Sequence, residues 1–399
     1  MLKRAVLALF SILAIYIAAA YVYNNYLTQS LTFNRSPYEP KQSESLNYLK
    51  DKDTLKILII DGGGIRGLIP LYVINYIENR LNKPISEVFD IYSGVSTGAI
   101  IASGINIPEK YIPADYAGHD SATEYLIQLY KEESDYLFSS PWYHDLLSGW
   151  GLFSPSFLGE RLHRVLETHY TKSLTFTDLN NFVIIPALDI HSGRIHLFQN
   201  RGDAVRQLPT NSLYQLVAAA VSAETVFPPV AFRAAERSRE HSYFADAAMA
   251  MNNPTSLVLL NILEKFPNKK YYVLILGAGS PPLVSAQMDY SELKNWGRIR
   301  WIQDAFSSIY RFMDRQQLLA LDLAQLFSDR ERLEYDYLNI EVTDPFVDIF
   351  DYKSLQYLEI HADRLIEENQ QKMERIIERL NLPDEKNSKN DSQTKAPSH

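Results

Sequence analysis

The stretch LKILII at residues 55–60, followed directly by DGGGIRG at 61–67, decides how the rest of the chain is interpreted. A short run that is apolar at almost every position is typical of a parallel strand buried on both faces. Consecutive glycines after such a strand allow a tight turn whose backbone N–H groups converge on an anion. The two segments together predict a strand that delivers a glycine-rich loop to one edge of a sheet.

Short apolar runs and segments of helical spacing alternate along the chain. This rhythm predicts an α/β fold, a three-layer α/β/α domain with a mostly parallel central sheet. We expect the domain at residues 53–382, after a polar linker at 27–52 and before a disordered tail at 383–399. The expected strands are 55–60, 88–92, 182–188, 194–198 and 271–276, and the expected helices are 71–81, 97–103, 121–133, 156–168, 212–224, 253–265 and a long amphipathic region within 301–332.

A second motif, Gly94-Val95-Ser96-Thr97-Gly98, lies where an expected strand gives way to a helix. It fits G-x-S-x-G, in which a serine on a sharp turn exposes its hydroxyl. Gly94 and Gly98 would let strand and helix approach closely, and the helix N-terminus favours a developing anion. Ser96 is therefore a candidate nucleophile, and the alternative is a serine that caps the helix.

The third feature is Asp246, in the segment Phe244-Ala245-Asp246-Ala247-Ala248. Small apolar neighbours around a carboxylate are atypical of a surface loop. The local pattern fits a catalytic carboxylate and equally fits a residue that braces the loop.

These three motifs together resemble the patatin-like phospholipases, whose pattern is a D-G-G-G-x-[KR]-G loop, a G-x-S-x-G elbow and a downstream D-G-[GA]. The chain has DGGGIRG at 61–67, GVSTG at 94–98 and DAA at 246–248, so that Ala247 stands where the family has glycine. The segments VSAETVFPP at 221–229 and LGAG at 276–279 are also similar to the family. The resemblance extends over roughly residues 55–345.

The resemblance implies a lipid acyl hydrolase of phospholipase A or lysophospholipase type that cleaves fatty-acyl esters through an acyl-serine intermediate. Ser96 is then the nucleophile and Asp246 its direct proton acceptor, a Ser–Asp dyad. The backbone of Gly62, Gly63 and Gly64 would form the oxyanion hole, supported by Arg66. The substrate would be a phospholipid or another lipid ester, and no cofactor or metal is implied.

A Ser–Asp–His triad is the mechanistic alternative, because α/β-hydrolases place a histidine after the acid. Only His361 and His399 follow Asp246. We expect His361 at the surface of a polar helix, His399 in the tail, and His241 exposed among charged neighbours. The dyad is preferred.

Two alternatives of another class are weighed against the hydrolase. Gly62, Gly64 and Gly67 match the dinucleotide pattern G-x-G-x-x-G, but the next expected strand has Asp90 in its middle rather than an acidic residue at its end. A membrane-tethered lipid-binding protein without turnover would not need both Ser96 and Asp246.

Composition narrows the remaining classes of function. The 399 residues carry a net charge of −9 and no basic block, which argues against a nucleic-acid partner. The absence of cysteine excludes disulfides, thiolate catalysis and cysteine-ligated zinc. No cluster of His, Asp and Glu has the spacing of metal ligands.

Residues 1–26 carry a membrane signal. Lys3 and Arg4 precede an apolar run over 5–23 that is long enough to cross a bilayer as a helix. We expect a single-pass signal anchor with the main domain on the non-cytoplasmic side. A signal peptide cleaved after the alanines at 18–20, giving a secreted protein, is the alternative.

Aromatic and apolar residues also gather at 136–157, interrupted by Gly and Ser. This segment is interpreted as a loop or lid beside the acyl pocket rather than a helix. Its alternative role is to cap the sheet as part of the core.

Overall fold

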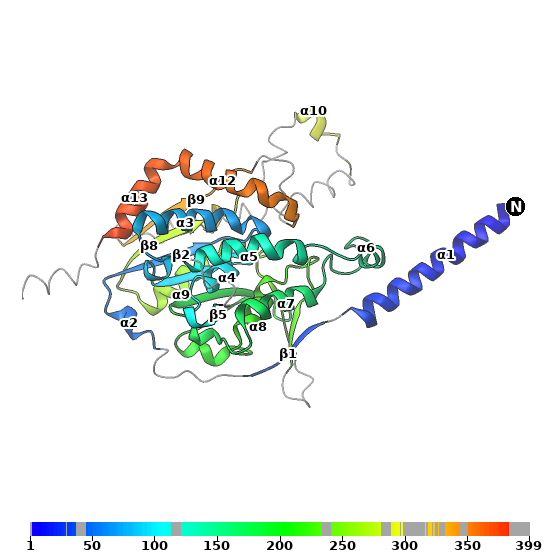
Figure 1. Cartoon of the computed structure of the whole chain (residues 1–399), viewed down its shortest axis with the longest axis horizontal. Helices are drawn as coiled ribbons and strands as arrows, with labels where there is room; N and C mark the ends of the chain where they lie inside the picture. Colours follow the sequence, from blue (N-terminus) through cyan, green and yellow to red (C-terminus); the bar gives the residue numbers. More distant parts are fainter. Residues whose placement is uncertain are drawn as a thin grey trace, which may run out of the picture.

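A computed structural model describes residues 2–28, 30–36, 45–112, 121–233, 241–280, 289–295, 297, 332–342 and 350–382, with a few positions between 316 and 326. The described strands form one mixed sheet of nine, with helices on both of its faces (Figure 1). The strands are β1 (Leu31–Asn34), β2 (Thr54–Ile60), β3 (Ile91–Gly94), β4 (Phe182–Asp189), β5 (Arg194–Gln199), β6 (Val230–Arg233), β7 (His241–Asp246), β8 (Lys270–Leu276) and β9 (Leu333–Leu338). The helices are α1 (Leu2–Val22), α2 (Asn47–Lys50), α3 (Leu68–Leu81), α4 (Thr97–Gly104), α5 (Ala122–Leu137), α6 (Trp142–Ser148), α7 (Gly159–Tyr170), α8 (Leu213–Val221), α9 (Thr255–Lys265), α10 (Tyr290–Leu293), α12 (Leu355–Glu368) and α13 (Gln370–Asn381).

The sheet has a parallel half and an antiparallel half. Strands β4, β3, β2, β8 and β9 lie side by side and parallel, with β2 at the centre. Strands β5 and β7 run antiparallel to β4, and β6 runs antiparallel to β7. The prediction of a mostly parallel sheet is therefore correct for β4, β3, β2, β8 and β9, and β1 and β6 form a further parallel pair, whereas β5 and β7 run antiparallel to β4.

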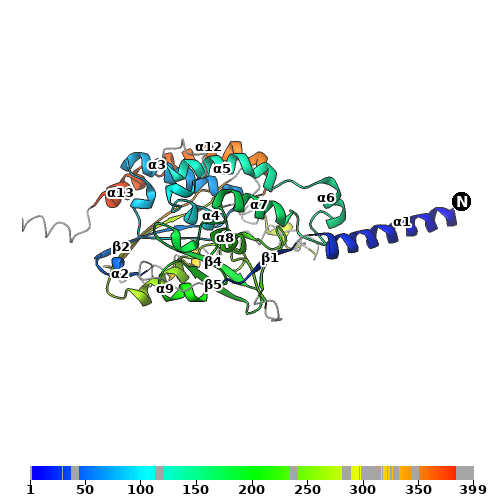
Figure 2. The ribbon, with the colours of Figure 1, turned by 60° about the horizontal axis from the view of Figure 1, so that its bottom comes forward.

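The two faces of the sheet bury different side chains of the same strand. In β2, Leu58 and Ile60 join the large core beneath α3, α4, α5, α7, α8 and α12, whereas Ile57 and Ile59 join a smaller core with α9. Figure 2 shows α3, α5 and α12 on one side of the sheet and α2 and α9 on the other. Burial on both faces explains why the LKILII run has no polar alternation.

Several expected elements differ from the structure. The segment at 27–52 is more than a linker, because β1 pairs in parallel with β6 and extends the sheet. Strand β3 begins at Ile91 rather than at 88, since the Asp90 carboxylate instead accepts from the Lys56 N–H at 2.8 Å. Most of the region at 301–332 and all of 383–399 lie outside the described residues.

The segment at 136–157 is partly helical, which corrects the expectation of a loop. Helix α5 continues to Leu137, α6 occupies Trp142–Ser148, and only the remainder is irregular. Helix α1 projects away from the domain, with its C-terminal end beside α6 (Figure 2). Among the described residues, one helical stretch, Ala8–Leu27, is long and apolar enough to cross a membrane.

Candidate active site

The nucleophile elbow depends on a backbone approach that leaves no room for side chains. Strand β3 pairs with β2 so that Gly94 lies opposite Ile60, and the Val95 N–H donates to the Ile60 carbonyl at 3.2 Å. A Cβ on Gly98 would overlap the carbonyl of Ile60, and one on Gly94 would overlap the backbone of Gly98. Both glycines are therefore required for α4 to begin directly against the end of β2.

Ser96 occupies the strained position of this turn. Its φ of 56° and ψ of −123° lie in a region that residues with a Cβ rarely adopt. The turn is closed by the Gly98 N–H, which donates to Val95 at 2.8 Å, and by the Ala99 N–H, which donates to Ser96 at 2.8 Å. This geometry lifts the Ser96 side chain clear of the strand and places it at the N-terminus of α4.

Strand pairing brings Asp246 to the elbow from the opposite direction. On one edge of β4, Ile184 pairs with Ser93 of β3 and Ala187 pairs with Asp246 of β7. On the other edge, both residues pair with β5. Strands β3 and β7 therefore follow one another along the same edge of β4. Because they run in opposite directions, their carboxyl ends meet, and Asp246 comes to face Ser96.

Asp246 is fully buried, and few described groups interact with its carboxylate. Its Oδ1 accepts from the Ala248 N–H at 2.8 Å, and its Oδ2 is buried without a hydrogen bond of normal geometry to any described residue. Burial raises the pKa of Asp246 to about 7, while the neighbouring Ser96 hydroxyl and the Ala248 N–H lower it and Glu224 raises it further. The carboxylate is thus poised near neutral pH, where a general base is effective.

The Ala247 that replaces a glycine of the motif fits without strain. Ala247 is absent from the described non-glycine residues with positive φ, and it is fully buried beside Val95 and Ala248. The left-handed freedom of glycine is therefore not needed after Asp246 in this chain.

The glycine-rich loop lies against the nucleophile. A Cβ built on Gly62 would lie 3.3 Å from that of Ser96, and Gly64 has a φ of 56°. The Gly62 N–H, however, donates to the Asn252 carbonyl at 3.1 Å, which corrects its expected place in an oxyanion hole. The N–H groups of Gly63 and Gly64 have no such backbone partner within the described ranges.

Three residues near the site were not singled out from the sequence. Asn252 holds the glycine loop twice, through its backbone carbonyl and through its Nδ2, which donates to Gly62 O at 3.2 Å. Thr97 supplies the first N–H after the nucleophile, a frequent oxyanion donor at such elbows. Glu224, whose pKa burial raises, contributes negative charge near Asp246. Glu224 lies in the segment 221–229 that is similar to the family, and Asn252 lies shortly after the DAA motif at 246–248.

Arg66 is buried in the short 3₁₀ turn Gly64–Gly67 that leads into α3. It therefore lies in the glycine-rich loop, as the motif requires. Its expected support of an oxyanion hole stays a prediction.

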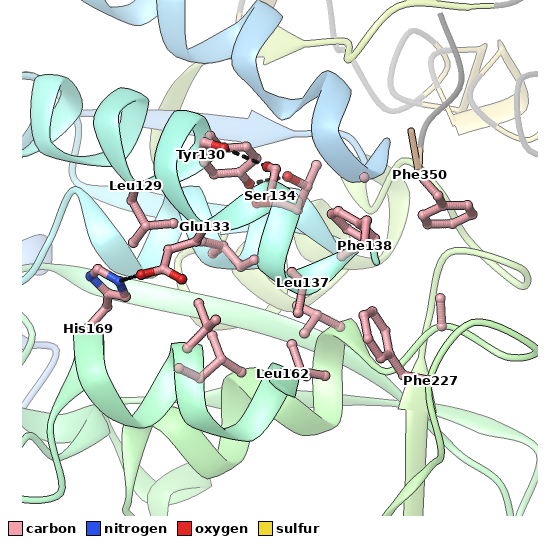
Figure 3. A pocket seen from close by; sticks show the side chains of 18 of the residues that line it. Leu129, Tyr130, Glu133, Ser134, Leu137, Phe138, Leu162, His169, Phe227 and Phe350 are labelled. Atoms are coloured by element: carbon pink, nitrogen blue, oxygen red, sulfur yellow. Dashed lines mark hydrogen bonds and ion pairs between the residues drawn. The ribbon is translucent and has the colours of Figure 1, made fainter. Parts of the chain in front are cut away.

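A mainly apolar pocket opens beside Ser96, with about 740 Å³ of empty space that includes its mouth. Figure 3 shows it between α5 and α7, with Phe138, Phe227 and Phe350 at one end and the Glu133–His169 ion pair at the other. Leu137 and Phe138 of the expected lid segment line it, whereas Trp142 and Trp150 do not. Its lining is Gly64, Ser96, Thr97, Ile100, Leu129, Tyr130, Glu133, Ser134, Leu137, Phe138, Leu162, Val165, Leu166, His169, Tyr170, Val221, Ala223, Phe227 and Phe350.

Comparison with known proteins shows the family of the chain. A family profile described as "Patatin-like phospholipase" matches residues 58–259, just over half of the chain. The chain belongs to the patatin-like phospholipase family. Members of this family are lipid acyl hydrolases, so the family supports hydrolase activity on lipids.

Two of the curated relatives of this patatin-like protein come from the plant Arabidopsis thaliana. Patatin-like protein 2 of Arabidopsis thaliana is 26% identical over 291 residues, which cover 67% of this chain and 69% of its own length. Patatin-like protein 3 of the same plant is 23% identical over 371 residues, 82% of each chain. The solved structure of VipD from Legionella pneumophila covers 86% of this chain and 71% of its own at 13% identity, with a TM-score of only 0.32.

Among the histidines in the described part of the chain, only His169 lines the pocket that holds Ser96. His361 is buried rather than exposed, because α12 packs against α3, but it does not line the pocket that holds Ser96. His241 begins β7 at the far end from Asp246, roughly 17 Å away along the strand. His169 lines the pocket, yet both of its ring nitrogens are engaged, by Tyr125 at 2.8 Å and by Glu133 at 3.1 Å.

We expect Gly98→Ala to lower the free energy of unfolding by about 3 kcal/mol or more, since the new methyl group meets backbone that is unable to move aside. Gly193→Ala is the matched control, because its added Cβ meets nothing within 4 Å and only its φ of +64° is unfavourable. The control should lose only about 1–2 kcal/mol. Urea denaturation of the full chain in detergent measures the free energy of unfolding of both variants. Equal losses of stability in the two variants would contradict the packing argument.

Asp246→Asn should stabilise the protein increasingly as pH rises. An unfolded aspartate ionises near pH 4 and Asp246 near pH 7, so between these values the native state binds the extra proton and wild-type stability falls as pH increases. The full effect is on the order of 4 kcal/mol, reached above about pH 7 and lost below about pH 4. Denaturation of both proteins at pH 5 and pH 8 tests this, and a pH-independent difference would show that the buried carboxyl does not titrate as described.

Proposed function

We propose that this protein is a serine lipid acyl hydrolase of phospholipase A or lysophospholipase type. Ser96 is the nucleophile and Asp246 its proton acceptor. The observation that carries the proposal is the strained elbow that aims Ser96 between a buried carboxylate and an apolar pocket. A binding protein without turnover has no need of a buried carboxylate whose pKa lies near 7.

The first half-reaction follows from the positions of these groups. The Ser96 Oγ attacks the acyl carbonyl carbon as its proton passes to Asp246, and the carbonyl oxygen becomes an oxyanion. Collapse of this intermediate breaks the ester bond, and the departing alkoxide takes the proton from Asp246 and leaves as an alcohol. In the second half-reaction water attacks the acyl-serine and gives its proton to Asp246. Collapse of this intermediate breaks the bond between the acyl carbon and Ser96 Oγ, Asp246 returns the proton to Ser96 Oγ, and the fatty acid is released.

The amides of Gly63, Gly64 and Thr97 are the donors that we assign to the oxyanion. Gly64 and Thr97 line the pocket together with Ser96, and Thr97 begins α4, whose N-terminal dipole adds to the field. The Gly62 amide is left out because Asn252 already accepts its hydrogen. The same arrangement disfavours the nucleotide alternative, since the glycine loop faces the elbow and the apolar pocket.

The acyl chain fits the pocket between α5 and α7. Its walls are formed largely by aliphatic and aromatic side chains such as Ile100, Leu129, Leu162 and Val165. An extended hydrocarbon chain gains about 0.8 kcal/mol for each methylene that it buries there. This favours long-chain fatty-acyl esters over short ones.

The N-terminal helix serves as the membrane anchor in this proposal. Its apolar residues from Leu9 to Val22 are largely exposed, which is unfavourable in water and favourable in lipid. Lys3 and Arg4 at its start would keep that end cytoplasmic and place the hydrolase domain on the other side. Cleavage as a signal peptide is the alternative fate of the segment.

Ser96→Ala should abolish labelling of the protein by a fluorophosphonate probe, because the probe reacts with an activated serine oxygen. The fold should survive, and thermal unfolding should stay close to wild type. Ser192→Ala, an exposed serine in the β4–β5 turn, is the control that should label fully. Full labelling of Ser96→Ala would refute the assignment, and an unlabelled wild-type protein would favour the binding-protein alternative.

Asp246→Asn should reduce kcat by roughly 10² to 10⁴, the range expected for loss of a general base. In the wild-type protein kcat should fall in acid with an apparent pKa near 7, because the carboxyl must be ionised to accept the serine proton. His241→Ala and His361→Ala should keep activity within a few-fold. A folded histidine variant as inactive as Asp246→Asn would establish a triad in place of the dyad.

A further inference from the structure

The anchor helix does not stand free of the hydrolase domain, because polar contacts fasten it to α6. The Tyr16 hydroxyl donates to the Leu146 carbonyl at 2.9 Å, and the Asn24 Nδ2 donates to the Leu147 carbonyl at 3.1 Å. The Tyr23 hydroxyl and the buried His144 Nδ1 are 2.8 Å apart. The hairpin at residues 139–157, which contains α6, therefore moves with the C-terminal half of the anchor.

His144 also ties the two arms of this hairpin together. Its Nε2 lies 3.0 Å from the Pro155 carbonyl, which only accepts, so Nε2 carries a proton and donates. In the neutral ring Nδ1 then accepts from the Tyr23 hydroxyl. The buried His144 side chain thus connects the anchor, α6 and the irregular segment that follows α6 in the hairpin.

The length of the anchor sets how deep the hairpin must lie. From Leu2 to Tyr16 the helix rises only about 21 Å, whereas the hydrocarbon core of a bilayer is about 30 Å thick. The part of the helix free of the domain is therefore too short to cross the membrane. If α1 spans, the hairpin beside Tyr16 must enter the bilayer by roughly 9 Å, the depth at which interfacial segments lie.

The hairpin has the surface that such a position requires. Trp142, Trp150 and Leu152 are each 76% exposed, and Phe153 is 62% exposed. Tryptophan favours the boundary between headgroups and acyl chains. Tyr21 of α1 (60%) and Tyr26 of the adjoining helical turn Tyr23–Leu27 (72%) are also exposed.

We infer that the 139–157 hairpin inserts into the interface of the same bilayer that α1 crosses. The inference rests on the proposed role of α1 as an anchor. The hairpin also carries Asp145, partly exposed at the start of α6, which is consistent with the headgroup boundary rather than the bilayer centre. The occupant is lipid rather than a second protein because the helix length demands this depth.

Insertion of the hairpin makes the proposed function more specific, because it indicates where the enzyme obtains its substrate. Leu137 and Phe138, which precede the hairpin, line the catalytic pocket, and Phe157 at its other end packs edge-to-face against Phe138 with ring centroids 5.5 Å apart. The pocket is thereby held at a constant height above one leaflet. The substrate class is lipid esters of the membrane in which the anchor resides, taken without release into water.

Tryptophan quenching tests the insertion without requiring turnover. The full chain carrying Trp296→Phe and Trp301→Phe retains Trp142 and Trp150 and is reconstituted into phosphatidylcholine vesicles. Retention through a carbonate wash first establishes the anchor. Bromines at the upper acyl positions should quench most of the fluorescence, and bromines near the chain ends much less. Unquenched fluorescence from carbonate-resistant protein would overturn the inference.

A second experiment measures the consequence for catalysis. Trp142→Ser/Trp150→Ser should lower hydrolysis of long-chain lipid in the protein's own vesicles at least tenfold, and turnover of a soluble butyrate ester should stay within twofold. Ile360→Ser, at an exposed apolar residue of α12 (63%), is the matched control and should change neither rate. Equal lipid hydrolysis by the hairpin variant and wild type would also overturn the inference. Failure of wild-type protein to cleave either ester would instead refute the proposed function and leave the quenching result standing.

Discussion

The close approach of α4 to the end of β2 is the constraint on which the site depends. It exists because Gly94 and Gly98 carry no side chain, so that two backbones meet where a methyl group would overlap. The turn between them forces Ser96 into a left-handed conformation that the surrounding sheet and helix maintain. The strain at Ser96 is thus balanced by packing over two strands and a helix, and its result is a partly buried serine at a helix N-terminus.

The second condition of the site is a carboxylate in a dry environment. Asp246 reaches the elbow because β7 enters the sheet antiparallel and ends where β3 ends. Burial of the Asp246 carboxylate, with no compensating cation among the described residues, disfavours its ionised form. This raises the pKa of Asp246 toward neutrality. The same burial lowers the stability of the native state at neutral pH and raises the affinity of the carboxylate for a proton.

The pocket and the N-terminal helix are connected through one segment of the chain. Helices α5 and α7 flank a mainly apolar pocket beside Ser96, and the hairpin that joins them in sequence contacts the N-terminal helix. Three hydrogen bonds join the N-terminal segment to α6, between Tyr16 and Leu146, Tyr23 and His144, and Asn24 and Leu147. In the proposed function, the segment between α5 and α7 therefore links the membrane anchor to the catalytic pocket.

The sequence by itself determined the features that arise from local patterns. The buried strand at 55–60, the two glycine motifs and the ordered set of motifs were sufficient to predict the α/β fold and the family, because these depend on neighbouring residues. Only the tertiary structure decided what depends on distant partners. It adds β1 to the sheet, buries His361 beneath α3, and commits the Gly62 amide to Asn252, 190 positions away. It also raises the pKa of Asp246, since the burial of a carboxylate is set by the whole fold and not by its neighbours in sequence.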